Sequence, residues 1–207
     1  MVATALAFAA ANYAEAREGF YIGLGTSYET IGGEFDGSVG MLEGFRVIHL
    51  PEIDNAFGVD LRAGYRTPEA WAVELELMRT VHKGTWTGQQ EDVTHDSFSI
   101  NAKYSFREKA VVQPFLLLGF SVNRLVVERG AADVLTGATG DARLTGPGLN
   151  LGFGADTYLG RHVSLGLGFT YRHVEYAERQ NNDQKKKINN RLNGSGFGIG
   201  LNVAYHF

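Results

Sequence analysis

The sequence predicts an all-β fold in which eight antiparallel strands close into an up-and-down transmembrane β-barrel. Three observations predict it. Apolar residues alternate with small or polar residues in eight separate segments, no helical periodicity competes with this alternation after the amino terminus, and short connections alternate strictly with long ones. The length of 207 residues suits a single domain.

Alternation of period two is the pattern of a strand with one apolar and one polar face. It is clearest at the carboxyl end, where every second residue is apolar up to the last: Phe197, Ile199, Leu201, Val203, Tyr205 and Phe207. The fifth segment is the least regular, because leucines fall on both of its faces. In chain order, the eight predicted strands cover residues 20–29, 57–66, 71–78, 97–106, 114–123, 149–159, 163–172 and 196–207.

The connections predict how the strands are arranged. The short ones are at residues 66–69, 107–112 and 160–161. The long ones cover residues 30–55, 80–96, 124–148 and 173–195. Because the two kinds alternate, all the long loops are expected at one end of the barrel and both chain termini at the other. An even number of strands, with short turns at one end and long loops at the other, is typical of barrels that span the bacterial outer membrane.

Two features predict that the apolar face points outward to lipid, rather than inward to a ligand cavity as in a soluble lipocalin-type barrel. The other face is poor in long charged side chains and rich in Gly, Ser and Asn, which suits the crowded interior of a narrow barrel. Aromatic residues also gather near the strand ends, with Trp71 and Tyr205 at the short-turn end and Tyr28 and Phe57 at the other. Such rings are expected at the level of the lipid head groups.

The amino terminus predicts export. Residues 1–16 form a short apolar run that ends in Ala14-Glu15-Ala16, a sequence that a signal peptidase can cut. We therefore expect a signal peptide at residues 1–16 and the barrel at residues 17–207. Cysteine is absent, which excludes disulfides and thiolate metal sites. The net charge of -4 gives no indication of nucleic-acid binding.

Three features together resemble the small eight-stranded OmpA/OmpX/opacity-type family of outer-membrane β-barrels: the stretch GFYIGLGTSYE at residues 19–29, the eight alternating segments and the terminal Phe207. The resemblance implies a place in the outer membrane of a Gram-negative bacterium, among lipid and lipopolysaccharide, with extracellular loops and periplasmic termini. In that family the alternating last strand, ending in Phe, is the signal that the outer-membrane assembly machinery reads. That role falls here on Leu201, Val203, Tyr205 and Phe207.

The polar face of the strands is predicted to carry a network of charges inside the barrel. Because an isolated buried charge is costly, these groups are expected to pair. The short turn at Thr67 and Pro68 is expected to bring Arg62 roughly opposite Glu74. The network either plugs the barrel, which a ring of eight strands favours, or lines and gates a small pore. Its predicted members are Glu29, Asp60, Arg62, Arg66, Glu74, Glu76, Lys103, Asp156 and Arg172.

A hydrolytic site is an alternative that the sequence does not favour. His82, His95 and Ser97 share the inward parity and Glu76 lies below them, so a nucleophile, a base and an acid could be drawn from these residues. Some eight-stranded outer-membrane proteins modify lipid A, but the H-x-S-N string of the lipid A deacylases is absent, and residues 95–98 read HDSF. The sequence predicts no enzyme. It also predicts no cofactor and no metal, because the histidines are scattered.

The long loops carry the remaining candidates. The first holds an apolar stretch, residues 41–53, which is expected to fold onto the barrel rim or to extend the hairpin. The fourth holds Lys185, Lys186 and Lys187, a basic patch that either faces lipopolysaccharide phosphates or binds an acidic extracellular ligand. The sequence thus predicts a structural or surface-interaction protein that displays four long extracellular loops on a plugged barrel. A small low-conductance pore is one alternative, and a lipid A-modifying acyl hydrolase or transferase is the other.

Overall fold

The computed structural model describes residues 18–37, 39–42, 46–86, 89–107, 110–128, 141–181 and 184–207. The predicted signal peptide, residues 1–16, lies outside these residues and stays a prediction. The barrel consists of β1 (Gly19–Glu29), β5 (Ala56–Arg66), β6 (Trp71–Trp86), β7 (Gln89–Ser105), β8 (Val112–Val127), β9 (Ala142–Tyr158), β10 (Val163–Asn181) and β12 (Gly196–His206). The shorter strands are β2 (Val39–Leu42), β3 (Arg46–His49), β4 (Glu52–Ile53) and β11 (Gln184–Asn193). Within the described residues, no helix is long and apolar enough to cross a membrane.

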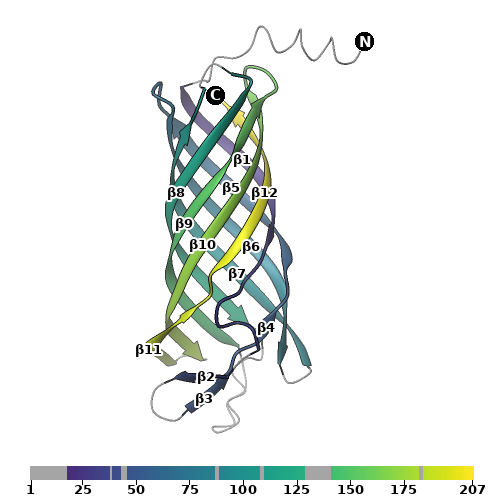
Figure 1. Cartoon of the computed structure of the whole chain (residues 1–207), viewed down its shortest axis with the longest axis vertical. Helices are drawn as coiled ribbons and strands as arrows, with labels where there is room; N and C mark the ends of the chain where they lie inside the picture. Colours follow the sequence, from purple (N-terminus) through teal and green to yellow (C-terminus); the bar gives the residue numbers. More distant parts are fainter. Residues whose placement is uncertain are drawn as a thin grey trace.

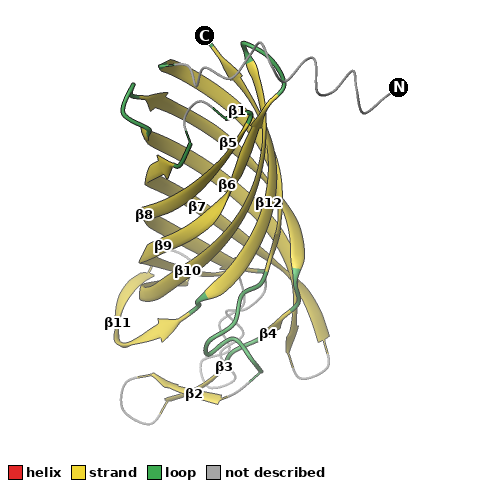
Figure 2. Cartoon of the chain, turned by 45° about the horizontal axis from the view of Figure 1, so that its top comes forward, coloured by secondary structure: helices red, strands yellow, loops and turns green. Residues whose placement is uncertain are grey.

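The barrel strands pair antiparallel with their neighbours, and the ring closes between the first and the last strand (Figure 1, Figure 2). β1 pairs with β5 on one side and with β12 on the other, so that Leu24 lies between Leu61 and Val203. Closure pairs backbone groups that would otherwise lie at an open edge, as a membrane-spanning sheet requires. The predicted all-β, eight-stranded up-and-down barrel is confirmed.

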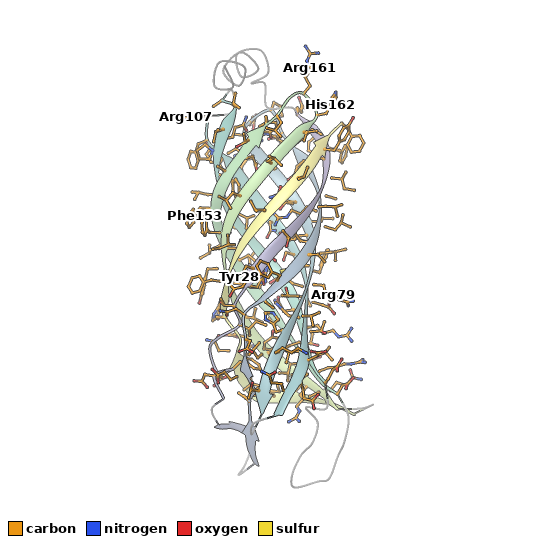
Figure 3. All side chains as sticks on the ribbon, turned by 90° about the vertical axis from the view of Figure 1, so that its right-hand side faces the viewer. Tyr28, Arg79, Arg107, Phe153, Arg161 and His162 are labelled. Carbon is orange, nitrogen blue, oxygen red and sulfur yellow. The ribbon has the colours of Figure 1, made fainter. Side chains whose placement is uncertain are left out.

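The two faces of the ring differ in polarity. Apolar side chains point outward, as Figure 3 shows for Phe153, and they are exposed: Phe57 is 74% exposed and Leu201 is 59% exposed. Inward-facing residues are polar and buried, such as Glu74 and Asn101. An apolar exterior around a polar interior is the reverse of a water-soluble barrel and suits a lipid surround.

Aromatic side chains pair at both margins of this apolar belt. Near the short turns, the rings of Trp71 and Tyr104 are 4.9 Å apart. At the opposite margin, the rings of Tyr28 and Phe57 are 5.0 Å apart. The belt is therefore bounded by aromatic pairs at the levels where head groups meet the hydrocarbon core.

Beyond the belt the strands continue, which corrects the predicted second and fourth loops. β6 and β7 stay paired as far as Trp86 and Gln89, so most of residues 80–96 is a β-hairpin. β10 continues to Asn181 and pairs with β11, so residues 173–195 are largely a hairpin as well. The sequence analysis ended these strands too early because the polarity of the two faces inverts at this level. Beyond it the outward residues are no longer apolar.

The inversion is visible on β6 and β7. Leu77 and Phe98 lie opposite each other in the outward apolar belt, and the next outward pair is Arg79 with Asp96, which form an ion pair. On the inward side, Val93 is 0% exposed. The ion pair marks the margin of the membrane-spanning belt. The barrel above it has a charged exterior and an apolar interior.

An apolar cluster lies inside the barrel at this end. Strand residues meet the first long loop there, and the ring of Phe35 lies edge-on to that of Tyr176 at 5.7 Å. Within the predicted apolar stretch, β2 and β3 form a separate hairpin, whereas Leu50 and Ile53 are buried in the cluster. We call the cluster the apolar cap; its members are Ile31, Phe35, Leu50, Ile53, Val93, Leu125, Val127, Leu144, Val174, Tyr176, Ile188 and Leu192.

Candidate functional site

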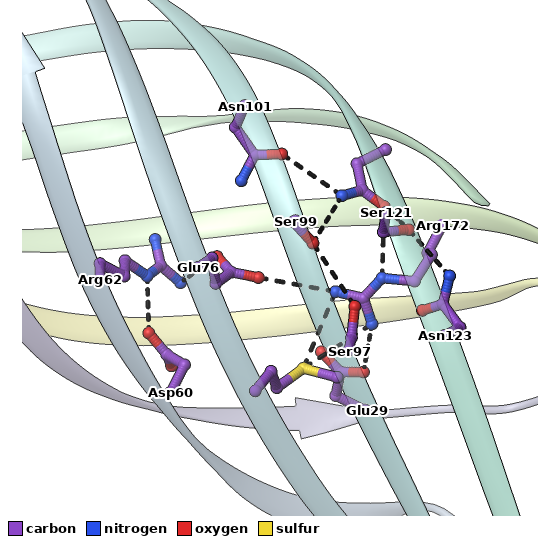
Figure 4. Close-up of polar contacts among 12 residues, drawn as sticks. Glu29, Asp60, Arg62, Glu76, Ser97, Ser99, Asn101, Ser121, Asn123 and Arg172 are labelled. Atoms are coloured by element: carbon purple, nitrogen blue, oxygen red, sulfur yellow. Dashed lines mark hydrogen bonds and ion pairs between the residues drawn. The ribbon is translucent and has the colours of Figure 1, made fainter. Parts of the chain in front are cut away.

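Arg62 binds several of the charged groups inside the barrel (Figure 4). Its Nε atom donates to Asp60 Oδ1 over 2.6 Å, and its Nη2 atom lies 3.3 Å from Glu76 Oε2. Its Nη1 atom lies 3.7 Å from Glu74 Oε1. One guanidinium thus neutralises carboxylates from two adjacent strands.

The register of β5 and β6 corrects one detail of the sequence prediction. Glu76 lies directly opposite Arg62, whereas Glu74 lies opposite Gly64. The turn between the strands is longer than expected. The Thr67 amide donates to the carbonyl of Trp71, so the turn is closed by residues 67 and 71. Glu74 is still within reach of Arg62, because the arginine side chain is long enough to reach a diagonal neighbour.

Arg172 connects this layer to β1. Its Nη1 atom donates to Glu29 Oε2 over 2.9 Å, and its Nε atom donates to Asn150 Oδ1 over 3.3 Å. Its Nη2 atom lies 3.7 Å from Glu76 Oε1, so Glu76 lies between the two arginines. Arg172 and Glu29 are both buried, so each charge would be left without compensation in the interior if the other were removed.

A second group of charges lies nearer the short turns. Lys103 Nζ lies 2.6 Å from Asp156 Oδ2. Arg66 was predicted to form an ion pair, but the partners described for it are neutral. Its Nη1 atom donates to the Tyr158 hydroxyl and its Nη2 atom donates to Gln113 Oε1, each over 2.7 Å. These two hydrogen bonds, and not a carboxylate, satisfy the buried guanidinium of Arg66.

Uncharged polar side chains fill the space between the charges, and the sequence analysis did not single them out. Asn150 Nδ2 donates to Ser99 Oγ over 3.1 Å and to Asn101 Oδ1 over 3.3 Å. Asn123 Nδ2 donates to Ser121 Oγ over 2.8 Å. Their shared inward parity is the signal that could have identified them. Interior cavities between these layers include two with volumes of about 20 and about 30 Å³, enough for one or two water molecules each.

The inward histidines are not assembled into a hydrolytic site. His82 Nδ1 is 2.8 Å from the Asp54 carbonyl, His95 Nε2 is 3.3 Å from Asn123 Oδ1, and Ser97 Oγ is 3.4 Å from Ser99 Oγ. The partner described for Ser97 is therefore another serine and not a histidine. Burial, together with the nearby Arg172 guanidinium, lowers the pKa of His95 to about 3, and burial lowers the pKa of His82.

The structure brings together two further serine–histidine pairs that the sequence analysis missed. One is buried, with Ser164 Oγ 2.9 Å from His206 Nε2. His173 Nδ1 is 2.8 Å from Ser195 Oγ, and His173 Nε2 is 3.7 Å from Glu175 Oε1. However, Ser195 Oγ donates to Asn193 Oδ1 over 2.6 Å, and Arg191 binds Glu175 over 2.5 Å. The serine proton thus has a closer acceptor and the acid has a stronger partner, so the group is a polar surface cluster. Among the described residues, no three His, Asp or Glu side chains are arranged to hold a metal ion.

The last strand is fully incorporated into the barrel. The amide of Phe207 donates to the carbonyl of Phe20 over 3.0 Å, which fixes the final residue against β1. The side chains of the predicted assembly signal face outward and are exposed: Leu201, Val203, Tyr205 and Phe207. Their role in assembly stays a prediction.

The predicted basic patch lies in a strand and not in a loop. Lys185, Lys186 and Lys187 belong to β11, where Lys187 pairs with Glu178 and Lys186 pairs with Arg179. Their role as a basic patch stays a prediction.

The family of the chain follows from its sequence. A family model described as "Outer membrane protein beta-barrel domain" matches residues 1–207. The chain belongs to this family. Membership indicates the bacterial outer membrane as its location. None of the curated proteins matches the sequence.

Solved structures of outer-membrane proteins share the fold. Neisserial surface protein A is 19% identical with a TM-score of 0.60, and the match covers 91% of this chain and 97% of that one. OprG of Pseudomonas aeruginosa is 16% identical with a TM-score of 0.61, over 95% and 100%. Ail, the attachment invasion locus protein of Yersinia pestis, in complex with the heparin analogue sucrose octasulfate, is 15% identical with a TM-score of 0.53, over 92% and 100%.

Proposed function

We propose that the protein is a non-enzymatic structural and surface-interaction barrel of the outer membrane. Its lumen is closed to solutes, its long hairpins and loops are displayed on the cell surface, and both termini lie in the periplasm. The observation that carries this proposal is that the barrel interior contains two separate groups of buried side chains. One is the charged layer around Arg62 and Arg172, and the other is the apolar cap.

The charged layer closes the middle of the barrel by filling it. Arg62 and Arg172 both reach Glu76 from different strands, so their side chains bridge the interior. The cavities described above and below this layer are small, with room for one or two water molecules each. Eight strands leave an interior just wide enough for side chains to fill.

The apolar cap closes the long-loop end by a different mechanism. Val93 and Leu125 are 0% exposed, and Phe35 of the first loop packs against Tyr176. Water and ions do not enter a narrow apolar constriction readily. Solutes would therefore meet a dry barrier before they reached the charged layer.

The orientation is inferred from the asymmetry of the connections. Outer-membrane barrels have short periplasmic turns and longer extracellular loops. The carboxyl terminus lies at the end opposite β2, β3 and β11 (Figure 1). We therefore assign the end that carries Phe207 to the periplasm, where the assembly machinery would meet the last strand.

Conductance across a planar lipid bilayer tests the closed lumen. The purified, refolded protein should give no stable channel, and neither should Arg62→Ala alone, because the apolar cap remains in place. Arg161→Ala, a change at the short-turn end, is the matched control. A stable ohmic channel from the wild-type protein that Arg62→Ala enlarges would contradict the plug and favour the low-conductance pore.

A second candidate function is the binding of an acidic extracellular ligand by the β10–β11 hairpin. The hairpin carries Arg179, Arg191 and the three lysines of β11. The Ail complex with sucrose octasulfate supports this candidate by analogy of fold. Sucrose octasulfate binding to cells that display the wild-type protein should fall when all three lysines are changed to Gln. Unchanged binding would remove this candidate.

Lipid A modification is not part of the proposal, because the groups around Ser97 and Ser195 are not arranged for acyl transfer, and the Ser164–His206 pair is buried near the short turns. Mass spectrometry of lipid A from cells with and without the protein should give the same profile. A lost or gained acyl chain that depends on Ser195 or Ser97 would reinstate the enzyme.

A further inference from the structure

Two histidines lie inside the barrel at the level where the apolar cap meets the polar interior. His82 on β6 and His95 on β7 are both buried. His95 pairs with Leu125 across β7 and β8, and Val93 is the next inward residue on its own strand. Leu125 and Val93 are fully buried members of the cap. A titratable ring therefore adjoins the packed apolar cluster.

Both histidines are held in a neutral form with one bare nitrogen. His95 Nε2 is 3.3 Å from Asn123 Oδ1, and His82 Nδ1 is 2.8 Å from the carbonyl of Asp54. A carbonyl oxygen accepts hydrogen bonds and cannot donate them, so the ring nitrogen that faces it carries the proton. The other nitrogens, His95 Nδ1 and His82 Nε2, are buried and have no hydrogen-bond partner among the described residues. A proton added there would create a buried donor without an acceptor, which is unfavourable.

Positive charge already lies near His95. Burial is the main cause that lowers the pKa of His95 to about 3, and the Arg172 guanidinium and His82 add to it. Asn123 from β8 and the Tyr176 hydroxyl from β10 are neutral, and burial raises the pKa of Tyr176. A protonated His95 would therefore be repelled by Arg172 and would gain no counter-charge from these neighbours.

Two carboxylates could compensate a charge on His95, but each already binds an arginine. Asp96, on the same strand, accepts hydrogen bonds from Arg79 at both oxygens. Glu29 of β1 lines the same small cavity as His95 and accepts a hydrogen bond from Arg172 over 2.9 Å. This cavity has a volume of about 10 Å³, no more than one water molecule needs. An imidazolium there would lack a hydration shell for as long as the cap stays closed.

Part of the cap belongs to the first long loop and not to the barrel strands. Leu50 and Ile53 of this loop are buried in the cap, and Asp54, the next residue, contacts His82. The loop is also held by the Asp54 amide, which donates to the carbonyl of Lys83, and by the pairing of β4 with β6. Release of these contacts leaves the pairing between the eight barrel strands intact. The loop is therefore the part of the cap that can separate.

We propose that His82 and His95 form an acid-operated latch, in which protonation of their bare nitrogens releases the first loop from the apolar cap and admits water to this end of the lumen. Histidine suits this role because its ordinary pKa lies just below neutral pH. The latch rests on the closed cap of the proposed function and adds a condition under which the cap opens. The charged layer around Arg62 lies beyond the cap, so release of the loop by itself makes no channel.

Cysteine labelling tests the latch, because the chain has no cysteine of its own. Val93→Cys places a thiol inside the cap, and Val81→Cys places one on the outward face of the same hairpin, where Val81 is 52% exposed. The purified barrel in nanodiscs is labelled with a charged methanethiosulfonate. Because low pH slows the reaction of any thiol, the rate for V93C is divided by the rate for V81C. This ratio should be small at about pH 7.

The ratio should rise about 100-fold at about pH 4.5, which is about two units below the ordinary pKa of His95. The double variant H82Q/H95Q should remove this rise, because amides do not titrate in this range. Ser99→Cys places a buried thiol in the charged layer and should stay protected at both pH values. This control separates release of the cap from unfolding of the barrel. Heat-modifiable migration on a gel shows that each variant is folded.

A V93C ratio that is equal at both pH values would overturn the latch, whether or not H82Q/H95Q assembles. A rise that persists in H82Q/H95Q, or labelling of S99C together with V93C in acid, would also overturn it. Fast labelling of V93C already at about pH 7 would contradict the closed lumen as well, because the cap would then be open without acid. A failure of the proposed function is thus distinguishable from a failure of the latch alone.

Discussion

Arg172 and Glu29 are 143 positions apart in the chain, yet Nη1 of Arg172 donates to Glu29 Oε2 over 2.9 Å. The bond joins β10 to the end of β1 across β12, close to the closure of the ring. Both side chains are only 8% exposed, so water cannot substitute for either partner. This pair therefore links the charged layer to the seam where the barrel closes.

The effects of removing the two members of this pair should be less than additive. Arg172→Gln leaves Glu29 buried without its cation and should lower the free energy of unfolding by about 3–5 kcal/mol. Glu29→Gln with Arg172→Gln should lower it by less than the sum of the two single changes. Urea unfolding of the refolded barrel in lipid vesicles measures all three variants. Additive effects would show that the two groups do not interact.

Acid should destabilise the long-loop end through His95. Its pKa is lowered in the folded barrel to about 3 from an ordinary value of 6.5, by burial and by Arg172. The unfolded chain therefore binds a proton first as the pH falls below 6.5. The contribution to stability is fully present above that pH and is lost progressively as the pH falls towards 3.

The size of this effect follows from the two pKa values. Between about pH 7 and about pH 5, His95 should account for a loss of about 2 kcal/mol of unfolding free energy. His95→Gln should remove this part of the pH dependence, because an amide does not titrate in this range. The difference between the two unfolding profiles isolates His95 from the carboxylates. Parallel profiles for the wild type and the variant would contradict the prediction.

The apolar cap should stabilise the barrel as a core does. Phe35 is 2% exposed and packs on Tyr176, so Phe35→Ala should cost about 3–5 kcal/mol by loss of burial and creation of a cavity. Phe120→Ala is the control, because Phe120 is 71% exposed to the lipid side. Thermal or urea unfolding in detergent compares them. An equal cost for both changes would mean that the cap is not a packed core.

Phe207 should matter for assembly beyond its contribution to lipid contact. Phe207→Ala keeps the backbone bond to Phe20 but removes the terminal ring, and deletion of Phe207 removes both. Either change should lower the amount of barrel in the outer membrane. Phe57→Ala, which removes a ring of similar exposure (74% against 69%) at the other margin, should have little effect. Normal outer-membrane levels of both Phe207 variants would refute the predicted assembly signal.

The membrane-spanning part of the fold could be predicted from the sequence because lipid imposes one rule on every strand. Outward residues such as Leu24, Leu61 and Val203 must be apolar, so each strand carries the pattern by itself. The extensions above the belt could not be predicted in the same way. There Val93 and Leu125 face inward and Arg79 faces outward. Apolar residues inside and charged residues outside are the pattern of a water-soluble barrel, so the polarity of each face is the reverse of that in the belt.

The candidate site shows the same division. The inward charged residues could be identified from parity, but their partners depend on register. Parity predicted only that Glu76 faces the interior, and the structure places it between Arg62 and Arg172. Parity alone could not indicate that Arg79 would bind both carboxylate oxygens of Asp96.

By itself, the sequence determined the number of barrel strands, which face of each strand is apolar, and at which end the long connections lie. These properties are local, because a strand of period two and a turn are each encoded in a few consecutive residues. Only the tertiary structure decided which charges meet, where the polarity of the faces inverts, and that the first loop contributes Phe35 to a buried cap. Those properties depend on the length of turns and on the closure of the ring, which join residues that are far apart in the chain.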